Sequence, residues 1–223
     1  MINIVVFGAG LHANVCIDII EKESKYKIVG IIDSRAEVNS IVHNYPIIGR
    51  QENLSKLQIE YKFNAGIIAI GDNYSRSIVK NSILNMDAKF KFINAIHPNA
   101  IIGKNVNLGV GIVIMAGVII NPESKIEDFC ILNTGAQLEH NCFMGQFSHL
   151  SAGSITGGKV SIGQFSAITL GVIILDRITI GENTVVGSGS IVLNNLPDNV
   201  LAYGQPAKVI RSRKLNDRFL KSN

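Results

Sequence analysis

Five histidines are the groups of this 223-residue chain best suited to exchange protons near neutral pH: His12, His43, His97, His140 and His149. An imidazole with a free ring nitrogen can accept a proton as a general base, and a neutral imidazole can also bind a metal. The three cysteines, at positions 16, 130 and 142, are odd in number and lack the spacing of a metal site. Their pattern fits buried thiols in a reducing compartment, so we expect a cytoplasmic protein.

A glycine-rich turn near the start could bind phosphate. Gly8-Ala9-Gly10-Leu11-His12-Ala13 joins an apolar run at 3–8 to a helical pattern at 11–23. Glycines let backbone approach a phosphate, and a helix N-terminus favours its negative charge. Asp33 follows a predicted strand at 27–32, where an acid can bind a ribose or a base edge. The same pattern also fits a plain strand-to-helix turn.

The elements around this turn indicate a small α/β lobe with a parallel sheet. Further strands are predicted at 65–70 and 91–96, and a helix at 73–85. Gly71 opens that helix at the sheet edge where ligands bind, although helix capping by Asp72 or Asn73 explains it equally well. Ninety-odd residues supply about half of a dinucleotide fold, so one nucleotide is favoured over NAD-dependent oxidoreduction.

From Ile102 to Val192 every sixth residue is large and apolar except Thr156, and a column two residues earlier is small or β-branched. Such a register predicts a parallel β-helix with three flat sides, about 18 residues per coil and about five coils, stacked roughly 4.8 Å apart. Glycine often follows the apolar residue, and we expect it to provide turn backbone that other residues resist. The glycines are at 103, 109, 145, 157, 163, 181 and 187.

The same phase places His140 on the exterior of the β-helix. It lies two residues beyond inward-facing Leu138, at or near a corner, and its neighbours one coil away are Pro122 and Gly158. Both neighbours are small enough to leave room beside an imidazole. His140 is therefore a candidate general base, against the simpler interpretation of an idle surface histidine.

Several stretches together resemble bacterial nucleotide-sugar acetyltransferases that join an α/β lobe to a hexapeptide β-helix. The family includes UDP-4-amino-sugar N-acetyltransferases of the bacillosamine pathway and is often described as sialic acid O-acetyltransferase-like. The resemblance implies a left-handed β-helix, a homotrimer and acetyl-CoA as co-substrate. Leu11 stands where this family usually has glycine. The matching stretches are Ile131-Leu132-Asn133-Thr134, Leu138-Glu139-His140-Asn141-Cys142, Gly145-Gln146-Phe147-Ser148-His149, Gly204-Gln205-Pro206-Ala207-Lys208 and Gly8-Ala9-Gly10-Leu11-His12.

The resemblance also implies roles for individual residues. His140 is the catalytic base, and Asn141 takes the place where relatives commonly carry an acid. Whether Asn141 or Glu139 orients the imidazole stays open. The cofactor is expected to contact His149, the Gly158 amide as a donor to the thioester oxygen, and Leu170 and Ser188 through their backbone. The nucleotide-linked amino sugar is expected to contact Gly8, Gly10, Leu11, His12, Asp33, Ser34, Gly71 and Asn133.

These observations predict three parts: a nucleotide-sugar-binding lobe at 1–96, a β-helix acetyltransferase domain at 97–200, and a C-terminal cap with a basic tail at 201–223. The tail carries Arg211, Arg213, Lys214, Arg218 and Lys221, which are either solvated or close to a cofactor phosphate. The apolar fraction of 47% is not concentrated in a run of about 18 residues, so no membrane span is expected. The sequence has no basic stripe interleaved with aromatic residues, so we expect no binding to nucleic acid.

The leading prediction is acetyl-CoA-dependent N-acetylation of a nucleotide-linked 4-amino-4,6-dideoxy or 2,4,6-trideoxy sugar for surface or glycoprotein glycans. O-acetylation of a sialic acid is the nearest alternative, with the nucleotide and the sugar undecided. A zinc lyase of the γ-carbonic anhydrase type needs three converging histidines, and only His140 and His149 lie on the β-helix, so no metal is expected. A non-catalytic scaffold is a further alternative, disfavoured by His140 and the C-terminal element.

Overall fold

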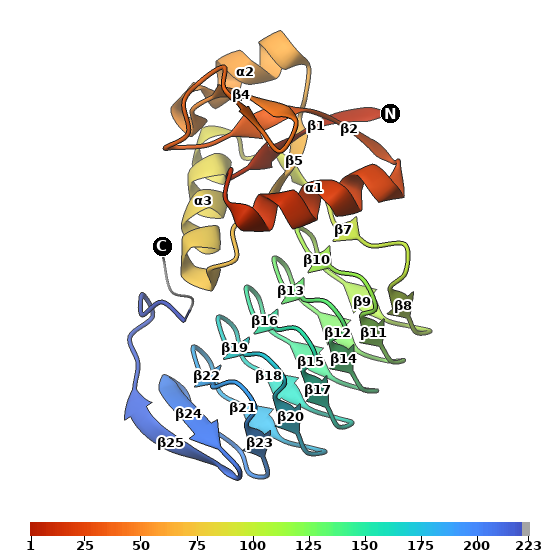
Figure 1. Cartoon of the computed structure of the whole chain (residues 1–223), viewed down its shortest axis with the longest axis vertical. Coiled ribbons are helices and arrows are strands. Elements are labelled where there is room, and N and C mark those ends of the chain that lie inside the picture. Colours follow the sequence, from red (N-terminus) through yellow and green to blue (C-terminus); the bar gives the residue numbers. More distant parts are fainter. Residues whose placement is uncertain (220–223) are drawn as a thin grey trace. The chain divides into compact units, whose positions relative to one another are not determined.

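The computed structural model describes residues 1–219 and contains two compact units (Figure 1). The first comprises Met1–Gly71 and Ser75–Pro98, and the second comprises Asp72–Tyr74 and the chain from Asn99 onward. No helix within residues 1–219 is long and apolar enough to cross a bilayer.

The first unit is the predicted α/β lobe, with a mixed sheet in the order β3-β4-β2-β1-β5-β6. All of its paired strands run parallel except β3 and β4, which form an antiparallel hairpin. Its elements are β1 (Ile2–Phe7), α1 (Leu11–Glu23), β2 (Tyr26–Ile32), β3 (Ile41–Val42), β4 (Tyr45–Gly49), the 3₁₀ turn η1 (Gln51–Asn53), α2 (Leu54–Tyr61), β5 (Ala65–Ile68), α3 (Asn73–Met86), β6 (Lys91–Phe92) and β7 (Ala95–Ile96).

Central strand β1 explains why the lobe folds around its first apolar run. Ile4, Val5 and Val6 are fully buried between β2 and β5, as expected for a parallel strand covered on both faces. The helix predicted at 11–23 has the bounds of α1. The predicted strands β1, β2, β5 and β6 pair in parallel, and the β3–β4 hairpin adds an antiparallel pair that was not predicted. One expectation was wrong: the strand predicted at 91–96 is interrupted at Ile93-Asn94, where β6 ends before β7 begins.

The second unit is a β-helix of two-residue strands, seen in Figure 1 as successive stacked coils. Its first face contains β10 (Val113–Ile114), β13 (Ile131–Leu132), β16 (His149–Leu150), β19 (Ala167–Ile168) and β22 (Val185–Val186). Its second face contains β8 (Ile101–Ile102), β11 (Ile119–Ile120), β14 (Gln137–Leu138), β17 (Ile155–Thr156), β20 (Ile173–Ile174) and β23 (Ile191–Val192). Its third face contains β9 (Asn107–Leu108), β12 (Lys125–Ile126), β15 (Phe143–Met144), β18 (Ser161–Ile162) and β21 (Thr179–Ile180).

The strand register confirms the 18-residue coil, because Ile120 pairs with Leu138 and Leu132 pairs with Leu150. The inward column is at most 1% exposed from Ile114 to Val192. Thr156 fits this column because its hydroxyl oxygen accepts the Glu139 N–H at 3.0 Å, which satisfies a polar atom that burial would otherwise penalise.

The glycines after the inward residues have a different purpose from the one predicted. Positive φ occurs two residues later, for example at Asn105, Phe147 and Lys159. A Cβ on Gly145 or Gly163 would instead lie 2.7 or 2.6 Å from a backbone nitrogen of the next coil. These glycines therefore allow adjacent coils to approach closely.

The C-terminal cap is a hairpin of β24 (Val200–Gly204) and β25 (Ala207–Ser212). Arg211, near the end of β25, pairs with Asp217 at 3.0 Å and remains mostly exposed, which fits the solvated interpretation. Lys221 lies outside the described residues.

Candidate active site

His140 occupies the corner that follows β14, and its side chain is exposed as the hexad phase predicts. Its Nδ1 lies 2.9 Å from Oδ1 of Asn141. Because an amide oxygen only accepts hydrogen bonds, Nδ1 is the donor, and in the neutral ring Nε2 is then the nitrogen with a free lone pair. Asn141 has a left-handed backbone, with φ 58°, which asparagine tolerates better than most residues. This arrangement presents Nε2 as a base.

Asn141 makes a hydrogen bond to the imidazole in this structure. The backbone N–H of Glu139 donates to the Thr156 hydroxyl. Which of the two side chains orients His140 in catalysis stays a prediction.

Gly158 forms the surface on which the imidazole rests. A Cβ on Gly158 would lie 2.6 Å from Nε2 and 2.7 Å from Cε1 of His140, so only glycine leaves the ring its present place. His140, Gly158, Lys159, Asp176 and Arg177 line a cavity of about 150 Å³. The space that the sequence predicted beside His140 is thus present.

The Gly158 amide is not a free donor. Its N–H donates to Oδ1 of Asp176 at 2.7 Å. In this structure a carboxylate already takes the hydrogen bond of this amide, so its expected contact with the thioester oxygen stays a prediction. The hexad phase places Asp176 one coil beyond Gly158, but it does not show which atom the Asp176 carboxylate contacts.

His149 is the first residue of β16 and only 4% exposed, and its ring packs edge-on against Phe219 at 5.6 Å between centroids. The outward positions of this face are buried along its length, as at Val113, Ile131 and Ala167. Contact of His149 with a cofactor rests on the resemblance alone.

Three other predicted residues lie at a different corner of the coil, the one that follows the first face. Leu170 is 57% exposed, and the Gly189 N–H next to Ser188 donates to its carbonyl at 2.8 Å. Gln205, from the predicted C-terminal element, donates to the Gly189 carbonyl at 2.7 Å. Asn133 belongs to this corner too. The structure groups His140, Asn141 and Gly158 at one corner and Asn133, Leu170 and Ser188 at another.

The glycine turn of the first unit has an accessible helix N-terminus. Gly10 is the N-cap of α1, no side chain caps it, and a Cβ there would meet no atom within 4 Å. Gly8 needs glycine, because its φ is +104° and a Cβ would approach Ile70 at 3.1 Å. His43 reaches this turn, with Nε2 3.2 Å from the Gly10 carbonyl oxygen. Leu11 is 82% exposed.

Asp33 holds this turn together. Its carboxylate accepts N–H bonds from Ala9 at 2.8 Å, Arg35 at 2.7 Å and Ala36 at 2.8 Å. Burial raises the pKa of the Asp33 carboxyl, but these bonds and the charge of Arg50 outweigh it and leave the pKa below its usual value. A ribose or nucleobase that binds Asp33, as expected from the sequence, would contact a carboxylate that already accepts three backbone N–H bonds of the loop. Asp33, Ser34 and Gly8 line a small cavity of about 50 Å³.

A buried arginine supports the neighbouring Gly71 loop. Arg76 is 1% exposed and donates to the carbonyls of Ile70 at 2.9 Å and Gly71 at 3.0 Å. His12 buries Nε2 without a hydrogen-bond partner in residues 1–219, and burial, with the charge of Arg76, lowers its pKa to about 4. His12 is therefore neutral at physiological pH. Sequence reasoning missed Arg76, although a charged residue within an amphipathic helical pattern was a usable signal.

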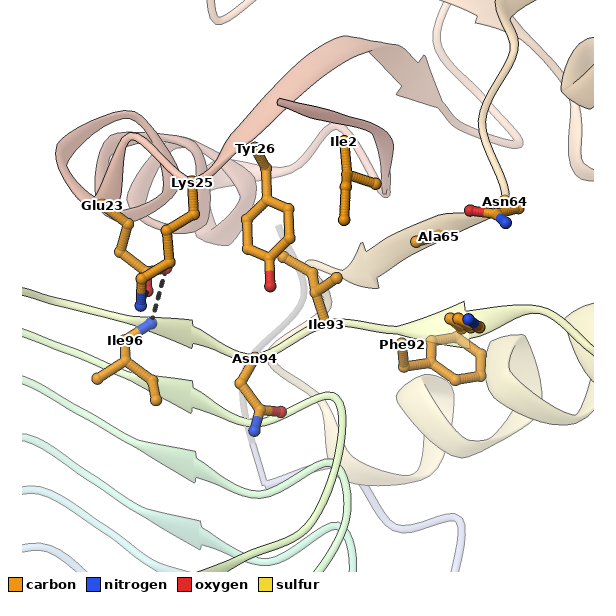
Figure 2. A pocket seen from close by; sticks show the side chains of 11 residues that line it. Ile2, Glu23, Lys25, Tyr26, Asn64, Ala65, Phe92, Ile93, Asn94 and Ile96 are labelled. Carbon is orange, nitrogen blue, oxygen red and sulfur yellow. Dashed lines mark hydrogen bonds and ion pairs between the residues drawn. The ribbon is translucent and has the colours of Figure 1, made fainter.

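A larger cavity of about 650 Å³ lies at the other end of the sheet (Figure 2). It is bordered by the first residues of four strands, Ile2, Tyr26, Ala65 and Lys91. The Glu23 carboxylate beside it accepts the Ile96 N–H at 3.1 Å and pairs with Lys25 at 2.9 Å. Ligands of parallel sheets bind at the carboxyl ends of strands, so the Gly8 and Gly71 edge stays the predicted nucleotide site.

Among residues 1–219, no three His, Cys, Asp or Glu side chains come together in a group that could hold a metal ion.

Comparisons with known proteins match this architecture along almost the whole chain. The family model for the PglD N-terminal domain matches residues 3–83. A variant of GDP-perosamine N-acetyltransferase from Caulobacter crescentus, bound to CoA and GDP-perosamine, is 36% identical; the match covers 94% of this chain and 97% of that one, with a TM-score of 0.88. The acetyltransferase domain of PglB from Neisseria gonorrhoeae, in complex with acetyl coenzyme A, is 28% identical, covers 93% and 98%, and has a TM-score of 0.84. WeeI from Acinetobacter baumannii, at 21% identity over 94% and 100% with a TM-score of 0.83, shares the fold.

Proposed function

We propose that the substrate of this chain is a nucleotide-linked amino sugar of a particular kind, and the proposal begins from the family. The chain belongs to the PglD-like nucleotide-sugar N-acetyltransferases with a hexapeptide β-helix. It is an acetyl-CoA-dependent N-acetyltransferase of nucleotide-linked amino sugars. Membership of this family decides for N-acetylation over the O-acetylation of a sialic acid.

The substrate is a GDP-linked amino sugar of the 4-amino-4,6-dideoxy class. Its support is the relative with 36% identity over 94% of this chain, whose structure holds GDP-perosamine. A UDP- or dTDP-linked sugar would need different protein contacts at its nucleobase. The chemistry at the sugar amine would be the same.

One observation carries the mechanism: His140 Nδ1 is held by Asn141, and Nε2 keeps its lone pair above Gly158. The sugar amine attacks the thioester carbonyl, a C–N bond forms, and the C–S bond to coenzyme A breaks. Nε2 of His140 takes the proton that the nitrogen loses, and the departing thiolate can take it back as CoA leaves. The charge on the carbonyl oxygen needs a fixed donor.

Removal of the amide that orients His140 should slow turnover. Asn141→Gly deletes the acceptor of the Nδ1–H bond and keeps a residue that suits φ 58°, so the backbone is unstrained. We expect kcat to fall about tenfold, because a loosely held imidazole spends less time in the productive orientation. Asn141→Asp, which keeps an acceptor, should stay active, and Glu139→Gln should change little. A larger loss for Glu139→Gln than for Asn141→Gly would give Glu139 the orienting role.

The complete site forms between copies of the chain in a homotrimer. Within one copy, the corner with His140 and the corner with Leu170 and Ser188 flank the second face of the β-helix. That face carries outward isoleucines that are exposed, including Ile101 at 62%, Ile155 at 37% and Ile173 at 48%. Apolar side chains in a row are suited to burial against another subunit, which would bring the two corners of neighbouring copies together.

A bulky residue at Gly10 should weaken only the nucleotide sugar. Gly10→Leu has open space for its side chain and an ordinary φ of −75°, so the melting temperature should not change. The side chain would occupy the approach to the α1 N-terminus, where the diphosphate is proposed to bind. We expect KM for the nucleotide sugar to rise roughly tenfold, about 1.4 kcal/mol, and KM for acetyl-CoA to stay constant. An equal rise in both constants would contradict a separate nucleotide site.

A substrate panel tests the proposed function. GDP-, UDP- and dTDP-linked 4-amino sugars are each mixed with acetyl-CoA and enzyme, and free CoA thiol is followed over time. The GDP-linked sugar should give the highest kcat/KM. Preference for UDP or dTDP would overturn the choice of base, and no CoA release with any of them would overturn the function.

A further inference from the structure

A carboxylate braces the corner of the β-helix at three places. Asp128 Oδ1 accepts the Val110 N–H at 2.9 Å, Asp176 Oδ1 accepts the Gly158 N–H at 2.7 Å, and Asp198 Oδ1 accepts the Glu182 N–H at 2.7 Å. Each acid lies on the coil after the amide that it binds. Each packs against a glycine, at 109, 157 or 181, where a Cβ would overlap its Oδ1.

The hydrogen bond of Asp176 differs from the other two because a candidate catalytic side chain packs on the amide that it holds. The imidazole of His140 packs so closely on Gly158 that a Cβ added to Gly158 would lie 2.6 Å from Nε2. The carbonyl of Gly158 accepts the Arg177 N–H at 2.9 Å, and the Lys159 N–H donates to the His140 carbonyl at 2.9 Å. The Asp176 side chain completes this set by holding the N–H side of Gly158.

We infer that Asp176 is a positioning residue for His140, a role that rests on the proposed function. The hydrogen bond of Asp176 fixes the Gly157-Gly158 backbone, and the imidazole of His140 packs on this backbone. A shift of Gly158 would therefore change the position of the ring and the direction in which the Nε2 lone pair points. Misplacement of a catalytic group by about 1 Å can cost as much as 10²-fold in rate.

The Asp176 carboxylate also occupies the hydrogen bond that the Gly158 N–H would otherwise offer to the thioester oxygen. Contact of this amide with the thioester oxygen would require the Asp176 side chain to release it.

The chain supplies its own control. Asp176→Ala removes the brace below His140, Asp176→Asn keeps an oxygen that can accept the same bond, and Asp128→Ala removes an equivalent brace at Val110. Assays use the full-length enzyme with acetyl-CoA and the best nucleotide sugar of the panel. Both alanine variants should lower the melting temperature by similar amounts, since each loses one hydrogen bond of the same kind.

Only Asp176→Ala should lower kcat, by about tenfold, with KM for both substrates within about twofold of wild type. Asp176→Asn should recover most of this loss, and Asp128→Ala should keep the wild-type kcat. In a His140→Ala background, Asp176→Ala should cost nothing further, because its effect passes through the imidazole.

Equal kcat values for Asp176→Ala and Asp128→Ala would overturn the inference, and so would an Asp176→Asn enzyme as slow as Asp176→Ala. Failure of the proposed function looks different. In that case His140→Ala would turn over at the wild-type rate, whatever the Asp176 variants do.

Discussion

Replacement of His140 by alanine should lower kcat by roughly 10²- to 10⁴-fold, the usual contribution of a general base. The imidazole is exposed at a corner and makes its side-chain hydrogen bond to a neighbouring surface residue, Asn141. Its removal should therefore leave the melting temperature nearly unchanged. The acetyl group and the amine would still meet, but the proton of the amine would have to pass to water.

The matched measurement is KM for acetyl-CoA, which should stay within a few-fold of wild type because His140 acts on the amine. Intact melting with lost turnover would place the defect in chemistry. Turnover within a few-fold of the wild-type rate would remove His140 from the mechanism.

Addition of one methyl group at Gly158 should be nearly as damaging. In Gly158→Ala the new Cβ would come 2.6 Å from Nε2 and 2.7 Å from Cε1 of His140, far inside normal contact distance. The ring must turn away, because the backbone below it is held by Asp176 and Arg177. We expect kcat to fall on the order of 10²-fold, the cost of a misplaced catalytic group.

A double-mutant cycle identifies the cause. If Gly158→Ala acts through the imidazole, then Gly158→Ala combined with His140→Ala should be no slower than His140→Ala alone. Additive losses would mean that Gly158 contributes by some other route, such as the amide donor first expected from the sequence.

The β-helix could be predicted because its signal repeats. Each inward residue from Ile114 to Val192 obeys the same burial requirement, so single exceptions such as Thr156 do not hide the period. The hairpin of β3 and β4 carried no such signal. Its strands are short, and its turn at His43-Asn44 takes left-handed backbone without a glycine. The interruption between β6 and β7 is equally local.

The site was predictable where it depends on phase and not where it depends on long-range contacts. Phase alone placed His140 outside and Gly158 beside it. The burial of His149 depends on Phe219, seventy residues away, and on a face whose outward positions are covered. The brace from Asp176 joins two coils through a side chain, and Arg76 acts on carbonyls of a preceding loop. The 18-residue phase places Asp176 next to Gly158, but no pattern in the sequence shows which backbone groups Asp176 and Arg76 bind.

The central claim is acetyl transfer to a sugar amine, and the identity of the product tests it most directly. Enzyme, acetyl-CoA and a GDP-linked 4-amino sugar are incubated together, and the nucleotide sugar is analysed by mass spectrometry before and after treatment with hydroxylamine, which cleaves acetate esters and spares amides. We expect a single added acetyl group that survives hydroxylamine. An unmodified sugar nucleotide, or an acetyl group lost to hydroxylamine, would contradict it.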